Sequence, residues 1–217
     1  MQEQKEFSIE VDKTSFAEMY EKSLLMLDSL TPHQYKALKE CMQGAPSGAL
    51  LPTHDVSLMG PAGSGKTFVA LHLMLQALSG DAAAHILFVV KNTALAYFVA
   101  KWLWVRVLKK QGSCEEGAQE VLSRFHVLCG AALERASFAV EGERLVLKEV
   151  TDAQTAYTLV VVDEAHDLID GTAEQIEEYT SNEGPTPRLL LSDVSQASTA
   201  DVVNVVSSLA SKTDERR

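Results

Sequence analysis

The chain has 217 residues, a formal net charge of −11, 46% hydrophobic and 23% charged residues. This composition is typical of one soluble globular domain, and the acidic balance argues against a whole-surface electrostatic grip on nucleic acid. The cysteines Cys41, Cys114 and Cys129 fit neither a disulfide framework nor a zinc-ligand pattern. Residues 1–10 lack the basic and apolar regions of a signal peptide, and no apolar run approaches the roughly 20 residues of a membrane helix. We therefore expect an intracellular protein that is neither secreted nor bound to a membrane.

The first 30 residues predict an N-terminal extension whose helical part begins at about residue 15, because apolar residues recur there at helical spacing. A second helix is expected directly after it. Thr31 is suited to the N-cap, Pro32 to the first turn and Gly44 to the position beyond the helix end. Residues 45–54 are rich in Pro, Gly and Ser and indicate a loop.

Short apolar strands alternate with helices along the rest of the chain. Strands are expected at 55–60, 85–90, 125–130, 157–163 and 188–193, and a β-ribbon arm at 143–150; helices are expected at 66–80, 93–112, 115–125, 172–180 and 201–212. This alternation predicts an α/β fold, a three-layer sandwich with a mainly parallel sheet of about five strands. We expect residues 31–212 to form this single domain and 213–217 to be a polar tail. Ligands of such sheets bind at the carboxyl ends of the strands.

The segment GPAGSGKT at 60–67 matches the phosphate-binding pattern G-x-x-x-x-G-K-[ST]. Its glycines let successive N–H groups point at one anion, and the helix that follows adds its positive end. Lys66 is expected to reach the β- and γ-phosphates, and Thr67 to offer its hydroxyl to Mg²⁺. A plain glycine-rich turn is the alternative, which the preceding strand and following helix disfavour. The predicted nucleotide contacts are Gly60, Pro61, Ala62, Gly63, Ser64, Gly65, Lys66, Thr67 and Phe68.

The segment LVVVDEAHDL at 159–168 is an apolar strand that ends in two adjacent carboxylates. We expect Asp163 to hold Mg²⁺, through a water, because Mg²⁺ keeps much of its hydration shell. Glu164 is the predicted general base for a water aimed at the γ-phosphate. The alternative is a strand end followed by an acidic helix start, since Asp167 and Asp170 continue the acidic run.

The order strand, phosphate loop, helix and Asp-Glu strand resembles the RecA-like core of P-loop ATPases. The letters DEAH at 163–166 alone would suggest the superfamily 2 DEAH-box helicases, but LLLSDVSQAS at 189–198 resembles motif III of superfamily 1 helicases. Asp193 and Gln196 match that motif, with Ser192 in place of its glycine. The resemblance implies that Gln196 senses the γ-phosphate and takes part in catalysis with Glu164 and Lys66. The alternative is a polar strand end without nucleotide contact.

Two further segments resemble superfamily 1 motifs. LTPHQYKAL at 30–38 resembles the Q motif, which implies that Gln34 reads the adenine edge; the alternative is an exposed helical glutamine. Residues 87–103 loosely resemble motif Ia, which implies that 91–110 approach single-stranded nucleic acid, with Lys91, Asn92 and Thr93 nearest to phosphate. The amphipathic pattern of 101–110 favours instead an ordinary helix with a tryptophan packed inward and solvated lysines.

Superfamily 1 motors have two RecA-like domains, and the second supplies an arginine finger worth about 10³–10⁵ in kcat. The sequence beyond motif III is too short for a second domain, so we expect this chain to bind ATP and Mg²⁺ and to hydrolyse ATP weakly alone. Three interpretations stay open. The chain is the first motor domain of a longer helicase-like protein, or a small ATPase completed by an arginine of a neighbouring subunit, or a non-hydrolysing nucleotide-binding switch or degenerate relic.

Overall fold

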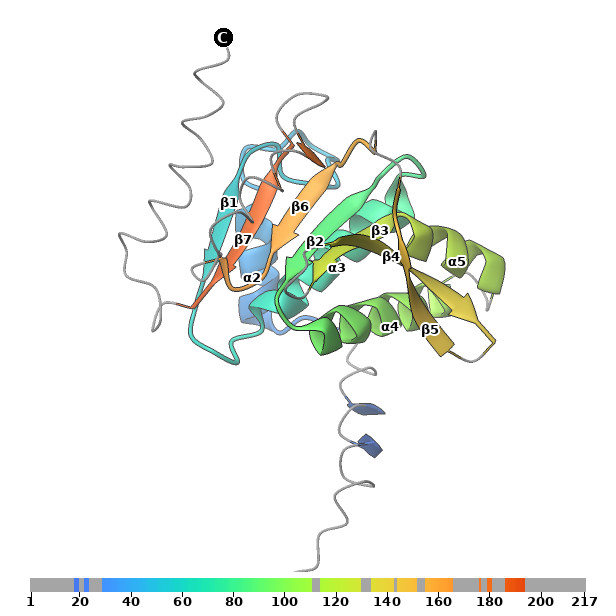
Figure 1. Ribbon diagram of the computed structural model, residues 1–217. Coiled ribbons are helices and arrows are strands. Elements are labelled where there is room, and N and C mark those ends of the chain that lie inside the picture. The colour runs from blue at the N-terminus through green and yellow to red at the C-terminus, as the bar shows by residue number, and fades with distance from the viewer. Residues whose placement is uncertain are drawn as a thin grey trace, which may run out of the picture.

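The computed structural model describes residues 18–19, 22–23, 29–110, 114–129, 134–142, 144–151, 155–165, 176, 179–180 and 186–193. Its helices are α2 (Pro32–Cys41), α3 (Lys66–Gly80), α4 (Thr93–Lys110) and α5 (Glu115–Ser123). Its strands are β1 (Val56–Met59), β2 (Ile86–Val90), β3 (Phe125–Cys129), β4 (Glu134–Glu141), β5 (Arg144–Glu149), β6 (Leu159–Val162) and β7 (Arg188–Ser192). Each of these strands belongs to one seven-stranded sheet (Figure 1).

Several predicted elements lie partly or wholly outside the described residues. The helix at 201–212, the tail at 213–217 and Gln196 lie outside them entirely. The helices expected from about residue 15 and at 172–180 are described only in part, and each described residue has helical backbone. These residues are Glu18, Met19, Lys22 and Ser23 in the first helix, and Ile176, Tyr179 and Thr180 in the second. None of the helices in the described part of the chain is long and apolar enough to cross a bilayer.

The strand order is β1-β7-β6-β2-β3-β4-β5. The five strands from β1 to β3 in this order are mutually parallel, whereas β4 and β5 form an antiparallel hairpin that extends the sheet beyond β3. The predicted α/β fold with a mainly parallel sheet is therefore confirmed. The phosphate-binding segment follows β1, and the two carboxylates follow β6. Strand β7, the last strand of the described chain, lies between β1 and β6 and therefore separates these two site segments.

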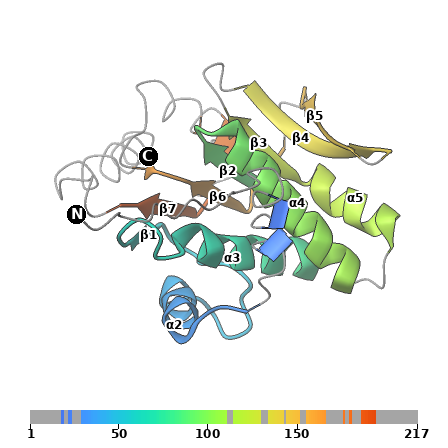
Figure 2. The same cartoon turned by 90° about the horizontal axis from the view of Figure 1, so that it is seen from below.

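The central strands are buried along their whole length because both faces of the sheet are covered. Phe88 and Val161 point to the face on which α3, α4 and α5 pack, whereas Leu87 and Val160 point to the opposite face, which Ile176 and Tyr179 help to cover. In Figure 2, α3 lies between the sheet and α2. The inward tryptophan expected in α4 is Trp102, which is fully buried.

Side chains stabilise two helix ends in ways that the sequence pattern implies only in part. The predicted N-cap of α2 is confirmed: the Thr31 hydroxyl accepts from the Gln34 N–H at 3.3 Å, and the Gln34 side-chain oxygen accepts from the Thr31 N–H at 3.0 Å. At the C-terminal end of α3 and in the turn that follows it, the buried guanidinium of Arg124 donates to the carbonyls of Leu78, Asp81 and Ala84 at 2.9–3.1 Å. Carbonyls at a helix C-terminus have no intrahelical donor, so Arg124 supplies one.

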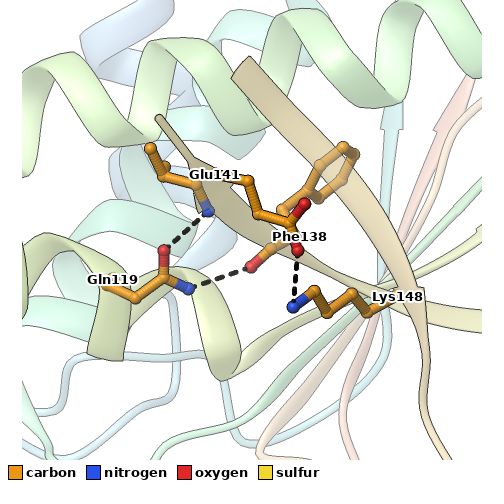
Figure 3. A network of polar contacts seen from close by, with 5 residues as sticks. Gln119, Phe138, Glu141 and Lys148 are labelled. Carbon is orange, nitrogen blue, oxygen red and sulfur yellow. Dashed lines mark hydrogen bonds and ion pairs between the residues drawn. The ribbon is translucent and has the colours of Figure 1, made fainter. Parts of the chain in front are cut away.

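The hairpin is held against α5 by a side-chain amide. The Gln119 amide donates to the Phe138 carbonyl at 3.4 Å and accepts from the Val140 N–H at 2.8 Å (Figure 3). This pair of hydrogen bonds takes the place of a neighbouring strand where β4 runs past the end of β3. An exposed ion pair of 2.9 Å between Lys148 and Glu141 links the two strands of the hairpin (Figure 3). The ribbon arm predicted at 143–150 is therefore β5, and its partner β4 was not among the predicted strands.

A buried polar network occupies the amino end of β3 and the residues before β6. His126 Nδ1 lies 2.7 Å from the Tyr157 hydroxyl, which also accepts from the Arg135 guanidinium at 3.2 Å. His126 Nε2 lies 3.0 Å from the Ser123 carbonyl, and since a carbonyl only accepts, Nε2 carries a proton. The Arg135 guanidinium also lies over the Tyr179 ring, 4.8 Å from its centroid. This network ties the parallel strands to the hairpin.

Candidate functional site

The carboxyl ends of β1, β7 and β6 bring three predicted site segments to one edge of the sheet (Figure 1). Residues 60–67 follow β1, Asp163 and Glu164 follow β6, and Asp193 follows β7. The main chain links the segments directly, because the Gly60 N–H donates to the Ser192 carbonyl at 3.2 Å. The Asp163 N–H donates to the Val89 carbonyl of β2 at 3.0 Å. The sheet therefore fixes the relative positions of the loop and the carboxylates.

The loop at 60–67 ends in a glycine whose conformation starts α3. Gly65 is the N-cap of α3 with φ of +87°, in the left-handed region that favours glycine. A Cβ at this position would also collide with the side-chain amide of Gln34. The first N–H groups of α3 have no intrahelical acceptor and point towards the loop, as an anion-binding helix N-terminus requires. The loop and its helix therefore have the geometry of a phosphate cradle.

The Lys66 ammonium lies over this loop. It donates to the Gly60 carbonyl at 2.7 Å and to the Pro61 carbonyl at 3.1 Å, and the residue is half-buried. A positive charge held within the loop, next to a helix N-terminus, makes an anion in the cradle electrostatically favourable. Its role as a phosphate ligand stays a prediction.

Thr67 and Asp163 meet across the site. The Thr67 hydroxyl donates to the Asp163 carboxylate at 3.3 Å, and both residues are half-buried. A hydroxyl and a carboxylate oxygen in contact suit Mg²⁺, which takes one or two protein oxygens together with substrate phosphates and waters. The described residues contain no group of three or more His, Cys, Asp or Glu side chains that could hold a metal by themselves. The pair thus fits a magnesium ion that binds with a nucleotide.

Glu164 occupies an unusual backbone conformation next to Asp163. Its φ is 51°, and it is the only residue besides glycine with positive φ in the described chain. Such a conformation costs about 1–3 kcal/mol in a residue with a side chain and is concentrated at functional sites. The side chain is exposed, whereas Ala165 after it is buried and anchors the turn. The turn therefore presents a carboxylate to solvent at the edge of the site.

Gln34 and Phe68 flank the loop differently. The Gln34 amide donates to the Ser64 carbonyl at 3.5 Å, so the predicted base-reading residue touches the loop while it also caps α2. The Phe68 ring turns away into the α3–α4 interface, with its centroid 5.1 Å from that of His72 and 5.7 Å from that of Trp102. Phe68 stays a predicted nucleotide contact, although its ring packs against α4 and not against the loop.

The expected nucleic-acid segment at 91–110 is the turn after β2 together with α4. Asn92 caps α4, with its side-chain oxygen accepting from the Ala94 N–H at 2.9 Å. Thr93 forms a hydrogen bond with the Cys129 thiol, while burial raises the pKa of that thiol above its usual value. Lys91 and Lys101 are exposed, whereas Arg106 is buried over the Trp102 ring, 4.9 Å from its centroid. No pattern in the sequence indicates the contact between Thr93 and Cys129.

Comparison with known families gives one match. Residues 31–192 match the DEAD/DEAH box helicase family, which covers most of the chain and includes the phosphate loop, Asp163 and Glu164. No curated protein matches the sequence. The match confirms the predicted resemblance to helicases, and the finer assignment to superfamily 1 is not confirmed by it.

The similar solved structures include two of low identity. One is the large terminase of bacteriophage HK97, with 17% identity and a TM-score of 0.49, over 86% of this chain and 38% of the terminase. The other is the DUF1998 helicase MrfA, with 16% identity and a TM-score of 0.49, over 89% of this chain and 31% of the helicase. This chain therefore spans less than two fifths of the length of either protein.

Proposed function

The chain belongs to the DEAD/DEAH box helicase family, and on that premise we propose that it is an ATP-binding motor domain that hydrolyses ATP weakly on its own. The observation that carries the proposal is the hydrogen bond between Thr67 and Asp163, at 3.3 Å. It joins the helix behind the phosphate loop to the carboxylate after β6, as a site for Mg²⁺ and a triphosphate requires.

Each residue has one chemical role in this proposal. Lys66 neutralises the β- and γ-phosphates, and the Glu164 carboxylate accepts a proton from the attacking water. A bond forms between the water oxygen and the γ-phosphorus as the bond from that phosphorus to the ADP oxygen breaks. Thr67 and Asp163 would hold Mg²⁺, which when bound would neutralise phosphate charge.

The expected weakness of hydrolysis follows from the positions of the described arginines. Arg124 binds main-chain carbonyls at the end of α3, Arg135 lies in the polar network, and Arg106 is buried against Trp102. Arg144 is the first residue of β5. Arg188 is the first residue of β7, and the site lies at the other end of that strand. An arginine finger from a second RecA-like domain or a neighbouring subunit would raise kcat by about 10³–10⁵.

Steady-state hydrolysis and equilibrium binding test this function. We expect slow Mg²⁺-dependent release of phosphate, a fall of about 10²–10⁴ in kcat for Glu164→Gln, and ATP binding that this variant keeps. Lys66→Ala should weaken ATP binding by at least about tenfold, because a charge-assisted contact to phosphate is lost. Binding without turnover in the wild type would favour the nucleotide switch, and ATP-dependent self-association would favour the subunit-completed ATPase.

The superfamily assignment is a finer proposal that rests on the strand end after β7. Asp193 is 2% exposed and directly follows the strand that lies between β1 and β6. A motif III of the superfamily 1 type predicts that Gln196→Ala lowers kcat while ATP affinity stays unchanged. Equal hydrolysis by wild type and Gln196→Ala would contradict it and favour superfamily 2, which the letters DEAH at 163–166 suggest.

Single-stranded nucleic acid is the partner that we propose for residues 91–110. The exposed Lys91 and Lys101 support this, since basic side chains gathered on one surface are the electrostatic footprint of a phosphate-binding site. Binding should weaken steeply with salt and disappear when both lysines are neutralised. Affinity that persists in the double variant would exclude this surface.

A further inference from the structure

Helix α2, whose Gln34 contacts the phosphate loop, presents an aromatic ring to solvent. Tyr35 is 52% exposed, and the other strongly exposed large apolar residues in the described part of the chain, Met19 and Met59, are not aromatic. Tyr35 directly follows Gln34. The Gln34 amide donates to the Ser64 carbonyl and lies so close to Gly65 that a Cβ at that position would collide with it. The ring therefore projects from the helical turn that contacts the loop.

The two sides of the loop differ in a way that orients a bound nucleotide. On one side Thr67 contacts Asp163, the predicted magnesium ligand, which marks the end where the terminal phosphates lie. On the other side Ser64 and Gly65 contact α2 through Gln34. A triphosphate with its γ-phosphate near Asp163 directs its ribose and base away from that carboxylate, towards α2.

The Tyr35 ring has one face covered and is suited to stacking on the other. The Lys39 ammonium lies over the ring, 4.7 Å from its centroid. A cation over one face holds the ring in place at the small entropic cost of two side-chain torsions. Stacking of an aromatic ring on a base is favourable for every base, because each base has a π-face.

We propose that Tyr35 is the stacking platform for the nucleobase, with Lys39 holding the ring from the opposite side. This inference rests on the proposed nucleotide-binding function and adds a source of base affinity that is independent of hydrogen bonding. The platform binds purine nucleoside triphosphates regardless of base identity, and selection between bases belongs to Gln34. The two adjacent residues thereby divide affinity and selectivity between them.

The test compares ligands with and without a base on the full chain. Dissociation constants for ATP, GTP and inorganic tripolyphosphate are measured in Mg²⁺ for the wild type, Tyr35→Ala and Tyr35→Phe. Tyr35→Ala should weaken ATP and GTP binding by about tenfold each and leave tripolyphosphate binding unchanged. Tyr35→Phe keeps the ring and should bind all three ligands like the wild type.

The fluorescence of 2-aminopurine riboside triphosphate gives a second readout, because stacking quenches it. Bound to the wild type or Tyr35→Phe it should be quenched, and bound to Tyr35→Ala it should stay bright. Tyr35→Leu serves as a second variant that keeps apolar bulk without a π-system. Lys36→Ala is the matched control on the same helix, since Lys36 forms only a 3.7 Å surface ion pair with Glu40.

The possible failures are distinguishable. Unchanged ATP affinity in Tyr35→Ala, or an equal loss of ATP and tripolyphosphate binding, overturns the stacking platform while the nucleotide-binding function stands. Tripolyphosphate binding by the wild type without any added affinity for ATP also overturns it. Absence of binding by the wild type to any of these ligands overturns the proposed function and the platform together.

Discussion

The two ends of the parallel strands both carry polar side chains, but they differ in what those side chains contact. At the amino end, Arg124, His126, Arg135 and Tyr157 are between 4% and 8% exposed and bind one another or main-chain carbonyls. At the carboxyl end, Asp193 is buried as well, but Lys66, Thr67 and Asp163 are half-buried, and the partners of these three belong to the loop or to the opposite strand end. Glu164 there is open to solvent.

This difference separates stabilising polar groups from groups that are available to a ligand. A buried polar group that loses its partner costs its full desolvation free energy. The side chains at the amino end therefore keep one set of hydrogen-bond partners. The carboxyl end makes hydrogen bonds that a phosphate or magnesium ion can replace, such as those of Lys66 with the Gly60 and Pro61 carbonyls. Titratable side chains alone would not distinguish the two ends, whereas burial and partners do.

The largest expected effect comes from breaking the amino end at Arg124. Arg124→Ala removes the donor for three carbonyls at the end of α3 and in the turn that follows it, and should lower the free energy of unfolding by about 3 kcal/mol. Urea unfolding measures this, and the ATP affinity of the protein that remains folded should not change. Arg144→Ala, at an exposed position of β5, is the control and should unfold like the wild type. If Arg124→Ala changed the ATP affinity and left the stability unchanged, the amino end of the strands would serve the ligand and not the stability of the fold.

An intermediate effect is expected at the carboxyl end when Asp163 is changed. Asp163→Asn keeps the size of the side chain and an oxygen for the Thr67 hydroxyl, so the midpoint of thermal unfolding should change little. ATP affinity in Mg²⁺ should fall about tenfold, or about 1.4 kcal/mol, because a magnesium ligand loses its charge. Titrations with Mg²⁺ and with excess chelator measure this, and the variant and wild type should differ only in Mg²⁺. If the ATP affinities of the variant and the wild type differed as much in excess chelator as in Mg²⁺, Asp163 would not act through the metal.

The smallest expected effect comes from a single hydroxyl at the amino end. Tyr157→Phe removes the atom that joins His126 to Arg135 and should lower the free energy of unfolding by about 1 kcal/mol. Urea unfolding of the variant and the wild type measures the difference. Hydrolysis and ATP affinity should be unchanged, since the network lies at the opposite end of the strands from the phosphate loop. Loss of activity without loss of stability would show that the two ends communicate.

Local patterns were sufficient for most of the fold and for the positions of the loop and the two carboxylates. The phosphate loop specifies its own strand, turn and helix, and apolar runs marked the buried strands β2, β6 and β7. Strand β4 was missed although Ala136, Phe138 and Val140 alternate with other residues at a spacing of two, which is the signal of a half-buried strand. A two-residue turn between the paired Glu141 and Arg144, in which Gly142 has φ of +62°, supports the same assignment.

The remaining features depend on contacts between residues far apart in the chain, so no local pattern reveals them. The sequence predicts strand ends but not that β7 inserts between β1 and β6. It likewise contains no sign that His126, Arg135 and Tyr157 share a network, or that Glu164 takes a positive φ. Local patterns predict base recognition by Gln34 and an N-cap at Thr31, but the capping box that joins these two residues is seen only in the structure.

The position of β7 also has a consequence for the order in which the domain assembles. The phosphate loop is held by β1, whose described partner is β7, and the contact between Asp55 and Arg188 at this junction joins residues 133 positions apart. Closing so long a loop is slow, and pairings of this kind form late in folding. A ribosome must therefore release the chain as far as β7 before β1 is fixed in the sheet, so β2, β3 and β6 can associate first. Nucleotide would then bind only after β7 has paired with β1, and ATP would protect the newly made chain from proteases only from that point on.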